Sequence, residues 1–202
     1  MFSLEEGEML ISIAREAMET YVRERRILKP ERVPEKFLEK RGVFVTIETF
    51  PDFSLRGCIG YPEPALPLIK ALIDSAINAS TRDPRFPPVT ERELDKLVVE
   101  VSVLTKPELL DCPPNEYANN IKIGEHGLIV ERIPYRGLLL PQVPVEWEWN
   151  EEEFLSQTCI KAGLPLDAWL DRETKIYRFS AQIFTEKSPR GEVVEKTLKE
   201  GC

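Results

Sequence analysis

The chain has 202 residues, enough for one domain that folds without disulfides. Its net charge of -8 argues against a protein whose main task is binding nucleic acid, because phosphates attract basic surfaces. With four cysteines, no CxxC pair and one histidine, a zinc finger or His-rich metal site is close to excluded, and we predict no metal and no cofactor.

The sequence has no signal peptide pattern and no apolar stretch long enough for a membrane span, so we expect a cytoplasmic protein with reduced thiols. Its high content of Glu, Lys and Arg and its 17 prolines are typical of a heat-adapted protein.

Capping-box spacings and apolar periodicity predict the elements of the first half of the chain. These elements are a helix from Ser3 to about Arg25, a strand at 42–50, a helix from Leu66 to Ser80 that ends near Asp83, a short helix from Thr90, and a strand at 98–104.

The second half predicts a hairpin at 127–132 and 136–140, a helix from Asn150 that ends at Gly163, and a long strand at 175–185. We expect the tail from about residue 189 to be frayed. Helices and strands alternate without a strict βαβ period, so the predicted fold is α+β, with a mixed, largely antiparallel sheet packed with helices. No linker separates independent domains, and residues 1–202 are read as a single domain with two subdomains.

The strand at 98–104 predicts an apolar face of Val99, Val101 and Val103. Glu100 and Ser102 then share the opposite face. A carboxylate in an interior strand costs free energy unless it is paired, so we expect Arg85 or Arg136 as the partner of Glu100, unless Glu100 acts as a general base.

The most distinctive stretch is Leu-Arg-Gly-Cys-Ile-Gly at 55–60. Its glycines allow a tight turn or the close approach of another backbone. Cys58 is either a buried, inert thiol or a nucleophile whose pKa a nearby guanidinium would lower.

Several motifs follow one another along the chain: Leu55–Gly60, Asp83–Val89, Val99–Leu104, Gly124–Leu128, Arg136–Val143 and Lys161–Pro165. In this order they resemble the AMMECR family, which is named after a human chromosomal region linked to Alport syndrome, midface hypoplasia and elliptocytosis. The resemblance is to prokaryotic and archaeal members. It implies a compact α+β domain with two lobes. Members of the family are discussed as enzymes, because of the cysteine motif, and as regulatory or nucleic-acid-linked factors. Prokaryotic members often accompany, or are fused to, relatives of the Memo protein and a radical S-adenosylmethionine enzyme.

The leading hypothesis is an enzyme, or enzyme subunit, that binds a small anionic or carbonyl substrate. In it Cys58 is the nucleophile, and His126 or Glu100 moves protons. The alternative is a non-catalytic module that binds a protein partner, either Memo-like or a radical S-adenosylmethionine enzyme, and nucleic acid is the least favoured ligand. The residues expected to bind substrate are Arg56, Gly57, Gly60, Arg85, Arg136 and Gln142.

Trp147 and Trp149 alternate with glutamates. The acidic neighbours favour an amphipathic edge or a partner surface over a platform for stacking nucleic-acid bases.

Overall fold

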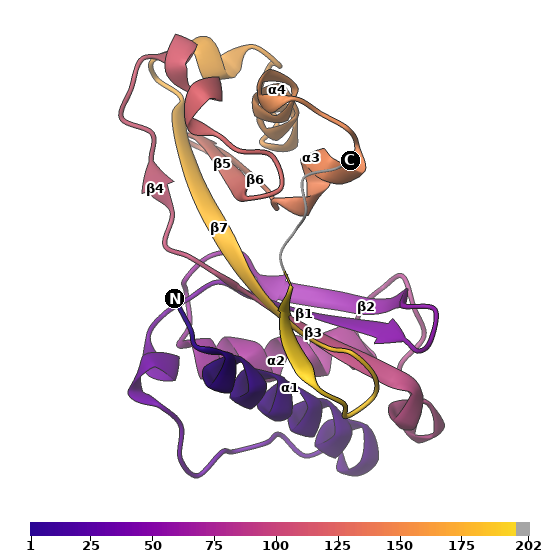
Figure 1. The fold of residues 1–202 in the computed structure, drawn as a ribbon. Helices are drawn as coiled ribbons and strands as arrows, with labels where there is room; N and C mark the ends of the chain where they lie inside the picture. The colour runs from indigo at the N-terminus through magenta and orange to yellow at the C-terminus, as the bar shows by residue number, and fades with distance from the viewer. Residues whose placement is uncertain (197–202) are drawn as a thin grey trace. The chain divides into compact units, whose positions relative to one another are not determined.

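The structure is a computed structural model of the chain and describes residues 1–196 (Figure 1). The chain divides into two compact units. Of the described residues, unit 1 contains 1–104 and 182–196, and unit 2 contains 105–181. The long strand β7 (Lys175–Glu186) begins in unit 2 and ends in unit 1.

Unit 1 contains two long helices, α1 (Leu4–Glu24) and α2 (Leu68–Thr81). At the start of α1, the Ser3 hydroxyl accepts from the Glu6 N–H, and the Glu6 carboxylate accepts from the Ser3 N–H, so the predicted capping box is present. The helix ends at Arg25, whose left-handed φ of 57° stops further helical pairing.

The strands of unit 1 are β1 (Val43–Thr49), β2 (Ser54–Tyr61) and β3 (Leu97–Leu104), with β1 antiparallel to both neighbours. The order is β2-β1-β3, followed by the end of β7, and β8 (Val193–Lys196) pairs with β7. Short 3-10 turns, η1 (Glu35–Leu38) and η2 (Glu91–Lys96), connect these elements. Strand β2 is therefore an edge strand of this part of the sheet.

One face of the unit 1 sheet forms a hydrophobic core with α1 and α2, which lie together under β1–β3 in Figure 1. Alternate residues of the strands point into this core because side chains alternate along a strand. The contributing strand residues include Val43, Val45, Ile47, Val99, Val101 and Val103, all nearly inaccessible to solvent. The predicted apolar face of β3 is confirmed.

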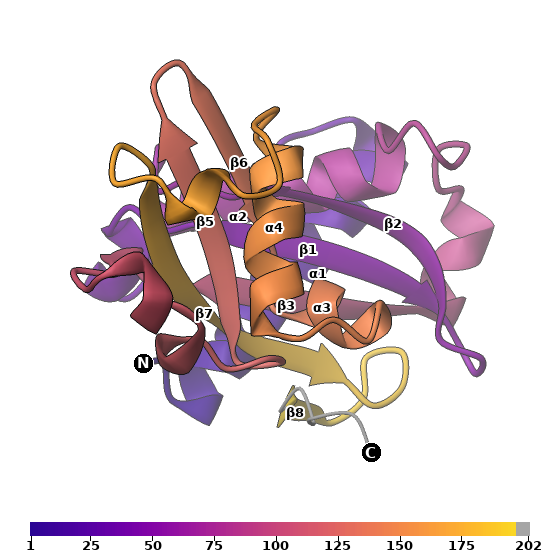
Figure 2. The same ribbon diagram turned by 90° about the horizontal axis from the view of Figure 1, so that it is seen from above.

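Unit 2 has a second core, formed where α4 (Glu151–Lys161) packs on the hairpin of β5 (His126–Arg132) and β6 (Tyr135–Leu139) (Figure 2). The first half of β7 pairs with β5 and with the short β4 (Glu108–Leu109). The remaining elements are α3 (Gln142–Glu146), η3 (Pro114–Glu116), η4 (Ala118–Asn120) and η5 (Ala168–Leu170).

The predicted α+β class and its largely antiparallel pairing are confirmed. Two local expectations differ from the structure. Residues 55–60 lie in strand β2 and do not form a tight turn. Residues 193–196 form β8 on the edge of β7 where a frayed tail was expected, because Val193 and Val194 are partly buried there. The rest of the predicted tail, 197–202, lies outside the described residues. No helix within residues 1–196 is long and apolar enough to cross a membrane.

Candidate functional site

The backbone of Cys58 is held at the outer edge of the unit 1 sheet by the turn that follows α2. The Cys58 N–H donates to Asp83 Oδ2 at 2.8 Å, and its carbonyl accepts from Arg85 Nη2 at 3.2 Å. Asp83 and Arg85 are paired with each other at 2.7 Å. An edge strand exposes backbone N–H and carbonyl groups that can pair with another strand, and at Cys58 a carboxylate and a guanidinium satisfy these groups.

Asp83 is almost fully buried, with 4% of its surface exposed. The guanidinium of Arg85 is the main reason that the pKa of Asp83 lies well below its usual range, and the Cys58 N–H adds to the effect. The Asp83–Arg85 pair therefore holds β2 against the end of α2. Arg85, predicted to bind a substrate anion, already has a carboxylate partner in this structure.

The two glycines of the motif allow close backbone contacts. A Cβ atom on Gly57 would lie 2.1 Å from the carbonyl oxygen of Ala79 in α2, and one on Gly60 would lie 2.4 Å from the carbonyl oxygen of Val43. Any side chain would therefore push α2 or β1 away from β2. Of the two uses expected for these glycines, the structure has the close approach and not the tight turn.

The face of the unit 1 sheet that points away from the core carries Thr46, Glu48, Cys58, Glu100 and Ser102. We call it the polar face. Thr46 pairs with Cys58 on one side and with Glu100 on the other, so these three side chains form a row across β2, β1 and β3. The predicted sharing of one face by Glu100 and Ser102 follows from the same register. Thr46 stands between Cys58 and Glu100.

The thiol of Cys58 is partly buried, and the Thr46 hydroxyl donates to its sulfur at 3.3 Å. Burial raises the pKa of Cys58 above that of an ordinary thiol, although Thr46 and Arg85 act in the opposite direction. An activated nucleophile requires a lowered pKa. The environment of this thiol therefore favours the neutral form.

Glu100 is 9% exposed and pairs with Lys196 of β8 at 2.9 Å. Burial alone would lower the pKa of Lys196, but the hydrogen bond and the charge of Glu100 outweigh it and raise that pKa. The partner of Glu100 among residues 1–196 is thus Lys196, and the expectation of Arg85 or Arg136 is wrong for the contacts described. Beside it, burial and the charge of Glu100 raise the pKa of Glu48.

Arg56 extends away from the polar face toward η2, where its Nε donates to Glu93 at 2.9 Å. The guanidinium also lies 6.0 Å from the centre of the Phe86 ring. Its Nη1 is buried and has no partner within residues 1–196. Through the Glu93 pair, Arg56 connects strand β2 to η2.

The other candidate residues belong to unit 2. His126 opens β5, and its Nδ1 accepts from the Lys122 N–H at 3.1 Å, while burial lowers its pKa. Arg136 on β6 pairs with Glu131 at 2.9 Å, and Gln142 begins α3. Unit 1 brings Cys58, Thr46, Glu100 and Arg85 into one region, and His126, Arg136 and Gln142 belong to unit 2.

Residues 11–184 match the model of the AMMECR1 family. The chain belongs to the AMMECR1 family.

AMMECR1 relatives with high identity come from archaea. A protein of Thermococcus gammatolerans is 58% identical over 95% of this chain and 96% of its own length. One of Methanocaldococcus jannaschii is 57% identical over 98% of each chain. A crystal structure of an uncharacterized protein from Pyrococcus horikoshii superposes with a TM-score of 0.84 at 54% identity, covering 96% of this chain and 98% of that one. These thermophilic sources agree with the heat-adapted composition.

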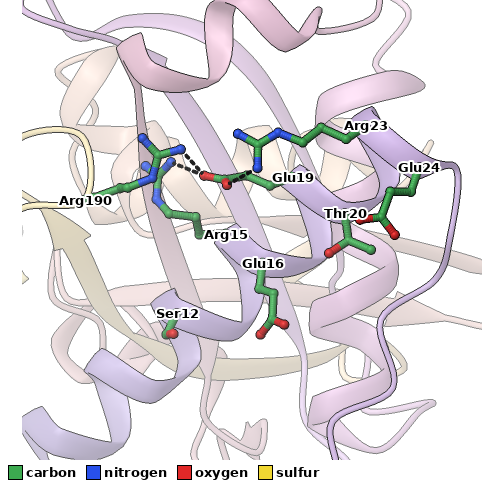
Figure 3. A pocket seen from close by; sticks show the side chains of 8 residues that line it. All are labelled: Ser12, Arg15, Glu16, Glu19, Thr20, Arg23, Glu24 and Arg190. Atoms are coloured by element: carbon green, nitrogen blue, oxygen red, sulfur yellow. Dashed lines mark hydrogen bonds and ion pairs between the residues drawn. The ribbon is translucent and has the colours of Figure 1, made fainter.

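A separate cavity of about 370 Å³ in the AMMECR1 chain lies along α1 (Figure 3). It is lined by three arginines, Arg15, Arg23 and Arg190, which all pair with Glu19. Arg15 also makes a close bidentate pair with buried Glu186, and Arg190 pairs with Asp95. These arginines carry partners already, so we interpret the cavity as part of a structural ion-pair network.

Sequence reasoning missed Thr46, Asp83 and Lys196 as neighbours of the AMMECR1 cysteine motif. The sequence does carry a signal for two of them: Thr46 alternates with the core residues of a predicted strand, and Asp83 is the first residue of the family motif Asp83–Val89. The sequence carries no such signal for Lys196, because it lies in the tail that is predicted to be frayed. Among residues 1–196, no group of three or more His, Cys, Asp or Glu side chains could hold a metal ion.

Proposed function

We propose that this chain is a binding protein that holds a protein partner through the β1–β2 hairpin, beside the cysteine motif. The observation that carries the proposal is the exposure of three large apolar side chains at that hairpin. Phe50, Phe53 and Leu55 are 39%, 44% and 41% exposed. Clustered exposed apolar side chains of this size are typical of protein-binding surfaces.

Hydrogen bonds within the hairpin, and one to η2, support the end of the hairpin. Asp52 accepts hydrogen bonds from the hydroxyls of Thr49 and Ser54 at 3.2 and 2.5 Å, and the Phe50 N–H donates to the carbonyl of Lys96 at 2.8 Å. The rings of Phe50 and Phe53 meet edge to face, with centroids 5.8 Å apart. A preordered apolar surface loses little conformational entropy on binding, which favours affinity.

The polar groups of the motif, by contrast, are used inside the protein. Arg56 pairs with Glu93, Arg85 pairs with Asp83, and the backbone of Cys58 is bonded to both members of the second pair. The thiol pKa is raised. These features favour a binding role over the enzyme hypothesis, in which Arg56 and Arg85 hold substrate and Cys58, with Glu100 or His126, reacts.

The resemblance to the AMMECR family supplies the candidate partners, a Memo-like protein or a radical S-adenosylmethionine enzyme. We place this interaction in the cytoplasm, where the free thiols of Cys58, Cys112 and Cys159 stay reduced.

Titration calorimetry of the chain with each candidate partner, both purified from the source organism, tests the proposal. We expect binding to one of them, and Phe53→Ser should weaken it at least about tenfold, because interface aromatics carry much of the binding energy. The matched control is Ile133→Ser, which removes an exposed side chain (88%) from the β5–β6 hairpin and should leave the affinity unchanged.

Two results would contradict the proposal: absence of binding to both candidates, and equal affinity of the wild type and the Phe53→Ser variant. A small-molecule turnover that is abolished by Cys58→Ser and retained by Phe53→Ser would instead support the enzyme hypothesis.

A further inference from the structure

Trp147 and Trp149 in unit 2 form a stacked pair, with ring centroids 6.0 Å apart and planes 19° from parallel. Trp149 is partly buried and packs against the hydrophobic core of unit 2. Trp147 is 66% exposed. The inner ring is thus anchored, and the outer ring is left largely open to solvent.

The turn after α3 creates this arrangement. The Trp147 N–H donates to the carbonyl of Val143 at 3.1 Å, and the Trp149 N–H donates to that of Pro144 at 2.9 Å. Between them Glu148 has a left-handed φ of 54°, a conformation that a non-glycine residue adopts only when surrounding contacts impose it. The reversal at Glu148 brings the two indoles together in a defined stack.

Acidic residues flank the exposed tryptophan in the sequence. Glu146 and Glu148 are both exposed, and within residues 1–196 neither side chain makes a hydrogen bond or an ion pair. Some exposed glutamates of unit 2 have cationic partners, such as Glu108 with Arg178 and Glu125 with Lys122, whereas others, such as Glu116 and Glu152, have no ion pair within residues 1–196. The exposed tryptophan therefore has, as its neighbours in sequence, two carboxylates without a cationic partner among residues 1–196.

We infer that this stacked pair is a docking platform for an arginine-containing basic segment of a protein partner. A guanidinium is planar and cationic, so it can stack on the open face of Trp147 while its N–H groups pair with Glu146 or Glu148. The two rings lie nearly parallel and do not enclose a cage, which favours the flat guanidinium over a compact ammonium. The net charge of -8 attracts basic partners over longer distances.

This site is independent of the proposed β1–β2 hairpin interface, because it lies in the other unit and shares no residue with it. Either proposal can fail without affecting the other.

Calorimetric titration of the whole chain at low salt tests the inference, with three synthetic peptides as probes: four Arg-Gly repeats, four Lys-Gly repeats and four Gln-Gly repeats. We expect the arginine peptide to bind several-fold more tightly than the lysine peptide, and the glutamine peptide not to bind. Trp147→Ala should weaken arginine-peptide binding about tenfold, whereas Trp147→Phe should retain part of it.

The paired variant Glu146→Gln with Glu148→Gln should weaken binding and reduce its dependence on salt, because screening acts on charge pairs. Ile133→Ala, an exposed apolar residue elsewhere in unit 2, is the matched control and should bind as the wild type does. The circular dichroism of each variant should match the wild type, since Trp147, Glu146 and Glu148 are exposed. Failure of the wild type to bind the arginine peptide, equal binding of the lysine peptide, or unchanged binding by Trp147→Ala would overturn the inference.

Discussion

The carboxylate of Asp83 accepts a hydrogen bond from the backbone N–H of Cys58 at 2.8 Å, across 25 positions of sequence. This bond fixes the edge of the motif strand against the end of α2, and Arg85 completes it by donating to the Cys58 carbonyl. These two hydrogen bonds fix the backbone of Cys58, and they also place Asp83 and Arg85 next to it.

Replacing Asp83 should destabilise unit 1. In Asp83→Asn a neutral amide replaces the carboxylate, and its NH2 group, a donor, takes the place of one accepting oxygen. Arg85 and the Cys58 N–H, which are donors too, are then poorly paired. We expect the free energy of unfolding to fall by about 2–4 kcal/mol. Guanidinium denaturation measures the loss, and Asp111→Asn, at an exposed aspartate, should change stability by less than about 0.5 kcal/mol. Equal stability of the two variants would contradict the role given to Asp83.

The ionisation of Asp83 should also make the free energy of unfolding depend on pH. The pKa of Asp83 is lower in the folded protein than its ordinary value of 3.8, which we take for the unfolded chain. As the pH falls below about 3.8, the unfolded chain therefore binds a proton at Asp83 more readily than the folded protein does. The stability that Asp83 contributes is therefore fully present above about pH 4 and is lost as the pH falls further. The difference in unfolding free energy between the wild type and Asp83→Asn should shrink between about pH 4 and pH 2.5. A constant difference over this range would show that the Asp83 pKa is not lowered.

Cys58 should react slowly with iodoacetamide. Burial raises its pKa, so at neutral pH less thiolate is present than in the unfolded chain. Mass spectrometry of the peptide containing Cys58, after brief alkylation of folded and guanidinium-unfolded protein, measures the two rates. Thr46→Val should slow the folded rate further, because the Thr46 hydroxyl stabilises the thiolate. Faster alkylation of folded protein near pH 7 would instead identify an activated nucleophile.

Gly57→Ala should be more damaging than a glycine substitution that only strains the backbone. The added Cβ would lie 2.1 Å from a backbone carbonyl of α2, which cannot move without shifting the helix, and we expect a loss of about 3 kcal/mol or more. Gly163→Ala makes a useful comparison, since space is available at 3.7 Å and only its φ of 79° opposes a side chain. That variant should lose about 1 kcal/mol. Thermal unfolding of both variants ranks them, and the reverse order would refute the close-packing explanation.

A double-mutant cycle tests the pairing of Glu100 with Lys196. We expect Glu100→Gln and Lys196→Met to couple by about 1 kcal/mol, since Lys196 is half exposed and solvent screens the pair. Denaturation of the wild type, both single variants and the double variant provides the coupling. Additive effects would mean that the two residues do not stabilise each other.

Much of the fold was predictable, because helix starts and alternating strands are encoded locally. The capping boxes at Ser3, Thr90 and Asn150 all form, and Val99, Val101 and Val103 face the core as their spacing predicted. For the motif at 55–60 the sequence left two uses of the glycines open, a tight turn or a close backbone approach. The structure has the close approach, to α2 and β1, and these partners lie too far away in sequence for the motif alone to reveal them.

The sequence by itself determined the α+β class, the family, the positions of most elements and the residues worth testing, since periodicity, caps and ordered motifs depend on neighbouring positions. Only the tertiary structure decided what those residues contact. It paired Glu100 with Lys196, Arg85 with Asp83 and Cys58 with Thr46, and it left Phe53 and Trp147 in solvent. The physical reason is that strand register and helix packing place residues side by side across long sequence separations, and burial and charge pairing then set how each group behaves.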